Sequence, residues 1–288
     1  MNRSTTYQNS IGSLLKHGFS KAKLHWRELG FMYICQLVLS AIVGVVMYTI
    51  LNTHIGQSAE LEKLANGFNR SVFMDMIYQN DGVFSPVFSL GSIILIVYIL
   101  SLLLLKGGYL TNVRKQEVGI MPMIKNGLKN YLPFLGYSIF SLIVLVVLSL
   151  LVIIPFQKIV GDPLVTFYSE KPFVWSVIGI SIIVLLITTL IYGFSALCKY
   201  GFLAKKSFGA GLIFAFSAIK SNVFKILRVM VTLVSLHIAI GYLYYIVMCD
   251  RGASSWVVVI LSIVIQQMFA MIRVFLGGVG IAIFDKIN

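Results

Sequence analysis

Six long apolar runs constrain this chain of 288 residues more than any other feature. Each run is long enough to cross a hydrocarbon layer, which needs roughly 20 mostly apolar residues in a helix. None of the runs contains an aspartate or a glutamate. The sequence therefore predicts an all-α membrane protein with six transmembrane helices in one polytopic domain, 1–288. The predicted spans are about Leu29–Leu51, Val87–Leu105, Leu132–Ile154, Phe173–Cys198, Ile226–Met248 and Ser255–Ile272.

The composition supports a membrane protein and argues against nucleic acid as a partner. Apolar residues make up 58% of the chain and charged residues only 11%. A soluble domain with this composition would expose a large apolar surface to water, which is unfavourable. The formal net charge of +13 accordingly indicates one basic membrane face, because no soluble surface large enough for nucleic-acid binding remains.

The distribution of charge predicts the orientation of the spans. With both termini in the cytosol, 18 of the 23 lysine and arginine residues fall on the inner side and 5 on the outer side. Seven of the ten acidic residues fall on the outer side. Cytoplasmic loops of membrane proteins carry this excess of basic residues. We therefore expect cytosolic termini and a multi-pass protein of the bacterial cytoplasmic (inner) membrane.

Three inner segments share an amphipathic pattern flanked by basic residues. Two of them begin with the motif K-x-G-[YF]-L, at Lys106–Leu110 and Lys199–Leu203. They end at Lys129-Asn130-Tyr131 and Lys220-Ser221-Asn222, which the first segment matches loosely at Lys23-Leu24-His25. The order predicts three pseudo-repeats of an interfacial helix plus two spans, at about 11–105, 106–198 and 199–288. The apolar stripes are Ile11, Leu15, Phe19, Ala22 and Trp26; Met121, Ile124, Leu128 and Leu132; and Leu212, Phe216, Ile219 and Val223.

These segments have two open interpretations. Their apolar faces can lie in the headgroup layer with lysines toward anionic lipid, or they can pack against neighbouring helices as elbows. In the first interpretation, the segments bind anionic headgroups of the cytosolic leaflet or another membrane protein. Its candidate contacts are Arg114, Lys115, Lys125, Lys129, Lys205, Lys206, Lys220, Lys225 and Arg228.

The repeat unit, its basic glycine motifs and the Ile154-Pro155 exit of the third span carry a family resemblance. The chain resembles an uncharacterised group of six-helix bacterial integral membrane proteins. That group is related to the membrane portion of some glycerophosphoryl diester phosphodiesterases. The resemblance implies the fold and a bacterial cell membrane. It implies no activity, because the sequence lacks the soluble phosphodiesterase domain.

Polar side chains inside the predicted spans are candidates for function by default. They are Gln36, His237, Gln266, Gln267 and Arg273. We expect His237 to form an interhelical hydrogen bond with Gln266 or Gln267, which favours a structural role over a substrate site. We expect Arg273 to mark the cytosolic end of the sixth span, with Val274–Phe284 as a short closing segment. The alternative function is a transporter or lipid-translocating protein that uses this polar seam.

The sequence gives little support for an enzyme. Gly193-Phe194-Ser195-Ala196 resembles the nucleophile motif of rhomboid proteases, but Ser195 and His237 differ in depth by on the order of 10 Å. The basic, glycine-rich stretch Lys205–Gly211 is more consistent with a hinge than with a phosphate loop. The histidines His17, His25 and His54 have no predicted acidic or cysteine partner. We therefore expect a non-enzymatic membrane protein with no metal site and no cofactor.

Overall fold

The computed structural model describes residues 11–50, 52–53, 85–160, 170–248 and 256–287, and helices account for almost all of them. Six of the helices are long and apolar enough to cross a membrane, which confirms the predicted all-α, multi-pass architecture. They are α3 (Trp26–Ile50), α6 (Ser85–Lys115), α8 (Tyr131–Val160), α10 (Glu170–Lys205), α11 (Phe208–Met248) and α12 (Trp256–Ile287). Two shorter helices are α2 (Ile11–Leu24) and α7 (Ile120–Lys129). The predicted span limits Leu51 and Ser255 lie outside the described residues.

Sharp bends separate the short helical segments from the spans that follow them. A turn at His25 separates α2 from α3, and Asn130, with φ of −107° and ψ of 13°, separates α7 from α8. The long helix α11 is kinked at Asn222, where φ is −132° and ψ is 26°. All three bends fall in the exit motifs that the sequence analysis aligned. The threefold repeat itself stays a prediction.

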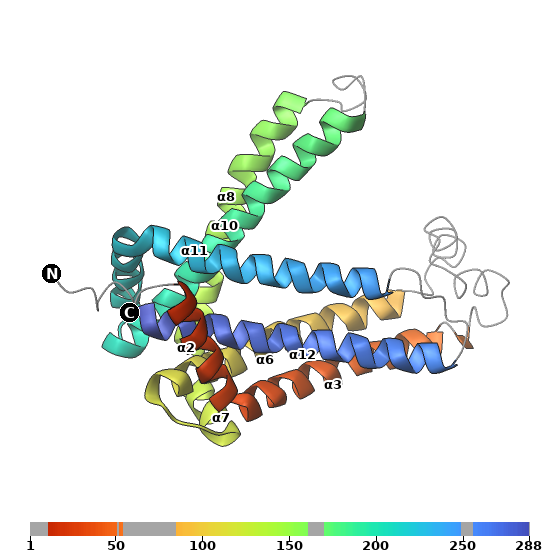
Figure 1. Ribbon diagram of the computed structural model, residues 1–288, viewed down its shortest axis with the longest axis horizontal. Helices are drawn as coiled ribbons and strands as arrows, with labels where there is room; N and C mark the ends of the chain where they lie inside the picture. Colours follow the sequence, from red (N-terminus) through yellow and green to blue (C-terminus); the bar gives the residue numbers. More distant parts are fainter. Residues whose placement is uncertain (1–10, 51, 54–84, 161–169, 249–255, 288) are drawn as a thin grey trace.

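The spans form two groups that meet at one end (Figure 1). Helices α3, α6, α12 and the second part of α11 run side by side, whereas the α8–α10 hairpin leans away from them. All six spans converge where α2, α7 and the first part of α11 (208–221) lie. We call this end the basic end. Away from the basic end the spans expose mostly apolar side chains, as expected for helices surrounded by lipid.

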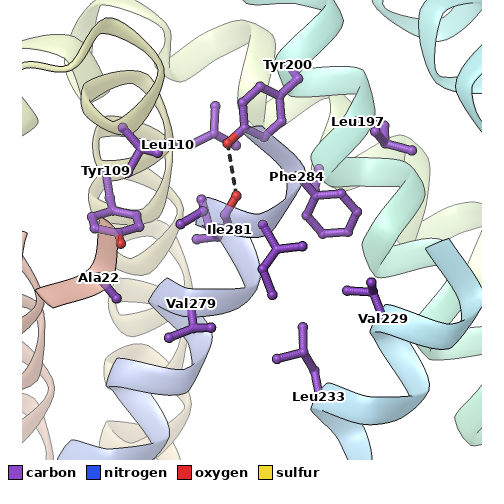
Figure 2. Close-up of a cluster of buried hydrophobic side chains, with 14 of the residues drawn as sticks. Ala22, Tyr109, Leu110, Leu197, Tyr200, Val229, Leu233, Val279, Ile281 and Phe284 are labelled. Atoms are coloured by element: carbon purple, nitrogen blue, oxygen red, sulfur yellow. Dashed lines mark hydrogen bonds between the residues drawn. The ribbon is translucent and has the colours of Figure 1, made fainter. Parts of the chain in front are cut away.

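The buried core lies at the basic end and is built around the C-terminal part of α12 (Figure 2). Val279, Ile281 and Phe284 pack there against side chains from α6, α10 and α11. Tyr200 donates a hydrogen bond of 2.9 Å to the carbonyl of Ile281, and Tyr109 donates one of 3.3 Å to the carbonyl of Gly278. The core therefore fixes the relative positions of the spans at this end.

α12 continues past Arg273 as one helix to Ile287, so Val274–Phe284 joins the sixth span without a break. Most residues of 276–284 are buried, and a continuous helix carries them into the core. Arg273 therefore lies within α12, about 20 Å along the helix axis from its end. The prediction that Arg273 marks the cytosolic end of the span stays a prediction.

Candidate functional site

A basic pocket lies at the junction of α6 and α7. Its volume is about 360 Å³, and Lys115, Lys125 and Lys129 are among the residues that line it. The only acidic side chain in the described lining is Glu117. This arrangement leaves an excess of positive charge, which suits an anionic ligand.

A hydrogen-bond network holds one wall of the basic pocket. Lys115 Nζ donates to Asn126 Oδ1 at 3.0 Å. The buried Asn126 amide donates in turn to Asn112 Oδ1 at 2.8 Å and to Glu117 Oε2 at 2.7 Å. Asn126 therefore positions both a cation and an anion of the pocket, and its own place is fixed by α6.

Lys206 belongs to the same basic surface although it comes from the end of α10. Its ammonium lies 5.4 Å from the centre of the Phe202 ring. Partial burial lowers the pKa of Lys206, and repulsion from nearby cations lowers this pKa further. These cations are Lys115, Lys129 and Arg114. Four predicted contact residues from two separate segments are therefore neighbours in space.

Arg114 makes a structural contact. Its guanidinium donates to the backbone carbonyl of Tyr200 and lies 5.9 Å from the centre of the Tyr200 ring. The contact ties the end of α6 to the end of α10. Arg114 therefore supports the basic pocket by joining these helices, and does not line it.

The remaining predicted contact residues lie apart from the basic pocket. Lys205 ends α10, and Lys220, Lys225 and Arg228 follow one another along α11. Lys205, Lys220 and Arg228 are exposed, whereas Lys225 is partly buried. The nine predicted residues thus do not form a single site.

The glycine-rich stretch 205–211 behaves as a hinge with close packing. A Cβ atom at Gly211 would lie 2.7 Å from the carbonyl oxygen of Cys198. Tyr137 donates a hydrogen bond of 2.7 Å to the carbonyl of Phe208 at the same place. This close approach of the start of α11 to α10 explains the glycine without a ligand.

The predicted hydrogen bond between His237 and a glutamine is wrong. His237 Nδ1 lies 2.8 Å from the carbonyl oxygen of Leu233 on its own helix. Gln267 accepts a hydrogen bond of 2.8 Å from Tyr33 of α3. His237 thus pairs with its own helix, and Gln267 pairs with α3. Because the predicted bond does not join α11 to α12, these two helices can leave a cavity between them.

Two adjoining cavities occupy this region of the bundle. One of about 410 Å³ includes Gln36, His237 and Arg273 in its lining. The other, of about 360 Å³, includes His237, Gln266 and Arg273. Four of the five predicted intramembrane polar residues therefore border cavities, whereas Gln267 pairs with Tyr33. Ser195, the nucleophile considered for a protease, borders a different cavity from His237.

A buried histidine–carboxylate pair was missed in the sequence. His25 and Glu28 are both fully buried, and His25 Nδ1 lies 3.0 Å from Glu28 Oε1. The same carboxylate oxygen accepts a hydrogen bond of 2.7 Å from the backbone N–H of Gly119. The sequence analysis considered His25 only as a metal ligand, whereas the i, i+3 spacing across the bend brings His25 and Glu28 together as a pair. Within the described residues, no group of three His, Cys, Asp or Glu side chains could hold a metal ion.

No protein-family model, curated protein or solved structure matches this chain.

Proposed function

We propose that this multi-pass membrane protein is non-enzymatic and binds anionic lipid headgroups at its basic end. The observation that carries the proposal is the outward face of α7. Met121 and Leu128 of α7 expose 75% and 60% of their surface, and Leu132, just after the bend at the start of α8, exposes 76%. Two of the lysines of the basic pocket, Lys125 and Lys129, stand on the same short helix. An apolar face beside lysines suits a helix that lies in the headgroup layer.

The inward face of α7 supports this interpretation over packing elbows. Met123, Asn126 and Gly127 are buried against the bundle. Three of the four residues of this apolar stripe are thus largely exposed. A helix that served only as an elbow would bury that stripe.

The first part of α11 has the same character. Ile213 and Phe216 expose 71% and 63% of their surface, whereas Ala215 is fully buried. Phe224, just after the kink, exposes 74%. Lys220 lies between these aromatic side chains and is exposed. Two helical segments at the basic end therefore offer lipid an apolar surface with cations beside it.

Charge reversal at Lys125, Lys129 and Lys206 tests the proposal. Each lysine near an anionic membrane contributes about 1 kcal/mol. The triple variant to glutamate should therefore bind anionic lipid at least about tenfold more weakly in titrations of detergent-purified protein. Lys158→Glu at the other end of α8 is the matched control, and should bind as wild type does. Unchanged binding in a folded triple variant would refute the proposal.

A second candidate function is movement of a lipid or small solute across the membrane. The cavities that share His237 and Arg273 favour it, because a closed apolar core would leave no path. Proteoliposomes should then exchange a fluorescent phospholipid between leaflets faster than protein-free vesicles. Equal rates for both kinds of vesicle would rule this function out.

The place of the protein in the cell forms part of the same proposal. The charge distribution supports a bacterial cytoplasmic membrane with the basic end toward the cytosol. The anionic inner leaflet would then face the lysines of the basic pocket. The relationship to the membrane portion of glycerophosphoryl diester phosphodiesterases stays a prediction.

A further inference from the structure

A third cavity, of about 300 Å³, lies between α6, α8, α10 and α12. Lys106 and Lys199 both line it. They are the first residues of the two K-x-G-[YF]-L motifs, which the fold brings to the lining of one space. We call this space the two-lysine cavity.

The two-lysine cavity lacks a negative charge to balance its cations. No aspartate or glutamate is among the described residues that line it. Lys199 Nζ donates to the neutral hydroxyl of Ser138 at 3.0 Å. Because both lysines line one cavity, their like charges repel each other. Two cations facing a partly buried space are costly there without a compensating anion.

Two hydroxyl groups complete a polar wall. Ser141 and Ser195 line the cavity and expose only 7% and 8% of their surface. The hydroxyl oxygen of Ser141 is buried and has no hydrogen-bond partner in the described structure. A buried hydroxyl without a partner costs stability unless a ligand satisfies it. Two ammonium groups and two hydroxyl groups, carried by α6, α8 and α10, therefore line the same cavity.

The rest of the lining is apolar. Leu142 and Leu145 come from α8, and Ile191 comes from α10. The lining joins residues of the α8–α10 hairpin to residues of α6 and α12 from the other group of spans. An occupant with a charged head and an apolar remainder would match both surfaces.

We infer that the two-lysine cavity binds a phosphate group, held by Lys106, Lys199 and the hydroxyl of Ser141. Phosphate oxygens accept several charge-assisted hydrogen bonds at once, and two ammonium groups balance the charge of a phosphate monoester. This inference goes beyond the proposed function, because none of the surface lysines assigned to headgroup binding lines the cavity.

Native mass spectrometry of the full chain in detergent tests the inference. The probes are short-chain phosphatidic acid, diacylglycerol with the same chains, and inorganic phosphate. Phosphatidic acid should bind at least about tenfold more tightly than diacylglycerol, since only the phosphate meets the lysines. Competition by inorganic phosphate identifies a soluble phosphate as the ligand, whereas lack of competition identifies the lipid headgroup. Both outcomes support phosphate recognition.

Single variants assign the binding to the cavity. Lys106→Gln and Lys199→Gln should each weaken phosphatidic acid binding about tenfold or more, and Ser141→Ala should weaken it a few-fold. Lys158→Gln, an exposed lysine on the same helix as Ser141, should bind as wild type does. If Lys199→Gln does not fold, Lys106→Gln and Ser141→Ala decide the question.

Two results would overturn the inference. One is wild-type binding of phosphatidic acid by folded Lys106→Gln and Ser141→Ala variants. The other is equal affinity for phosphatidic acid and diacylglycerol. In the first case, loss of binding in the triple surface variant would leave the proposed function intact.

Discussion

Glu28 is a carboxylate buried between three segments of the chain. It belongs to α3, lies beside His25 at the end of α2, and accepts the N–H of Gly119 before α7. Gly119 has φ of +137°, a conformation that few other residues adopt. One side chain thus fixes the positions of α2, α3 and α7 relative to one another.

Replacement of Glu28 by alanine should destabilise the protein. The variant leaves the N–H of Gly119 without its acceptor, a loss of about 1–3 kcal/mol in the free energy of unfolding. Thermal unfolding in detergent measures the change. Glu28→Gln should retain more stability, because its amide oxygen can still accept from Gly119.

Glu117→Gln serves as the comparison for Glu28. Its carboxylate lies 3.7 Å from Lys115 Nζ, and both side chains are nearly half exposed. An exposed pair of this kind contributes about 0–1 kcal/mol. Equal destabilisation by Glu117→Gln and Glu28→Ala would contradict the role given to Glu28.

Close contacts between helices depend on glycines at equivalent places in the two motifs. A Cβ atom at Gly108 of α6 would collide with the carbonyl oxygen of Met123 on α7. A Cβ atom at Gly201 of α10 would lie 2.7 Å from Cβ of Phe214 on α11. Each glycine thus lets an amphipathic helix fold back onto the end of the preceding span.

Gly108→Ala should therefore separate α7 from α6. Because the obstacle is backbone, the cost should be about 1–3 kcal/mol, as for overpacked cores. Gly30→Ala on α3 is the control, since nothing lies within 4 Å of its added Cβ atom. A thermal unfolding midpoint for Gly108→Ala equal to that of Gly30→Ala would refute the packing argument.

The exposed apolar stripe of α7 predicts how deep this helix lies in the membrane. A tryptophan introduced at Leu128 should lie among acyl chains if α7 occupies the headgroup boundary. With the three native tryptophans changed to phenylalanine, lipids brominated on the upper chain should quench its fluorescence strongly. A tryptophan at Gln116, in the exposed turn between α6 and α7, should be quenched less. Equally weak quenching at both positions would place α7 outside the membrane.

The basic end predicts an orientation for the whole molecule. The anionic inner leaflet and the positive-inside rule both favour that end in the cytosol. A green fluorescent protein fused after Lys286 should fluoresce, whereas alkaline phosphatase fused there should be inactive. Fusions after Lys158, at the other end of α8, should give the opposite result. Active phosphatase after Lys286 would reverse the orientation.

The overall architecture could be predicted because bilayer thickness acts on local sequence. A run of apolar residues without carboxylates specifies a spanning helix wherever it lies in the chain. The bends at His25, Asn130 and Asn222 were also visible as aligned motifs, since basic and polar residues interrupt the apolar pattern there.

Contacts between distant segments were decided only by the tertiary structure. The sequence predicted a His237–glutamine bond, but the Leu233 carbonyl and Tyr33 satisfied those groups instead.

Lys106 and Lys199, the lysines of the two glycine motifs, also show what the sequence determines and what packing determines. Their identity and spacing come from the sequence, which gives each one a place near the end of a span. Their convergence on one cavity depends on how α6, α8 and α10 pack. Local pattern therefore determined which segments span the membrane and where they bend. Packing between spans determined which polar groups meet, because partners far apart in the chain leave no periodic signal.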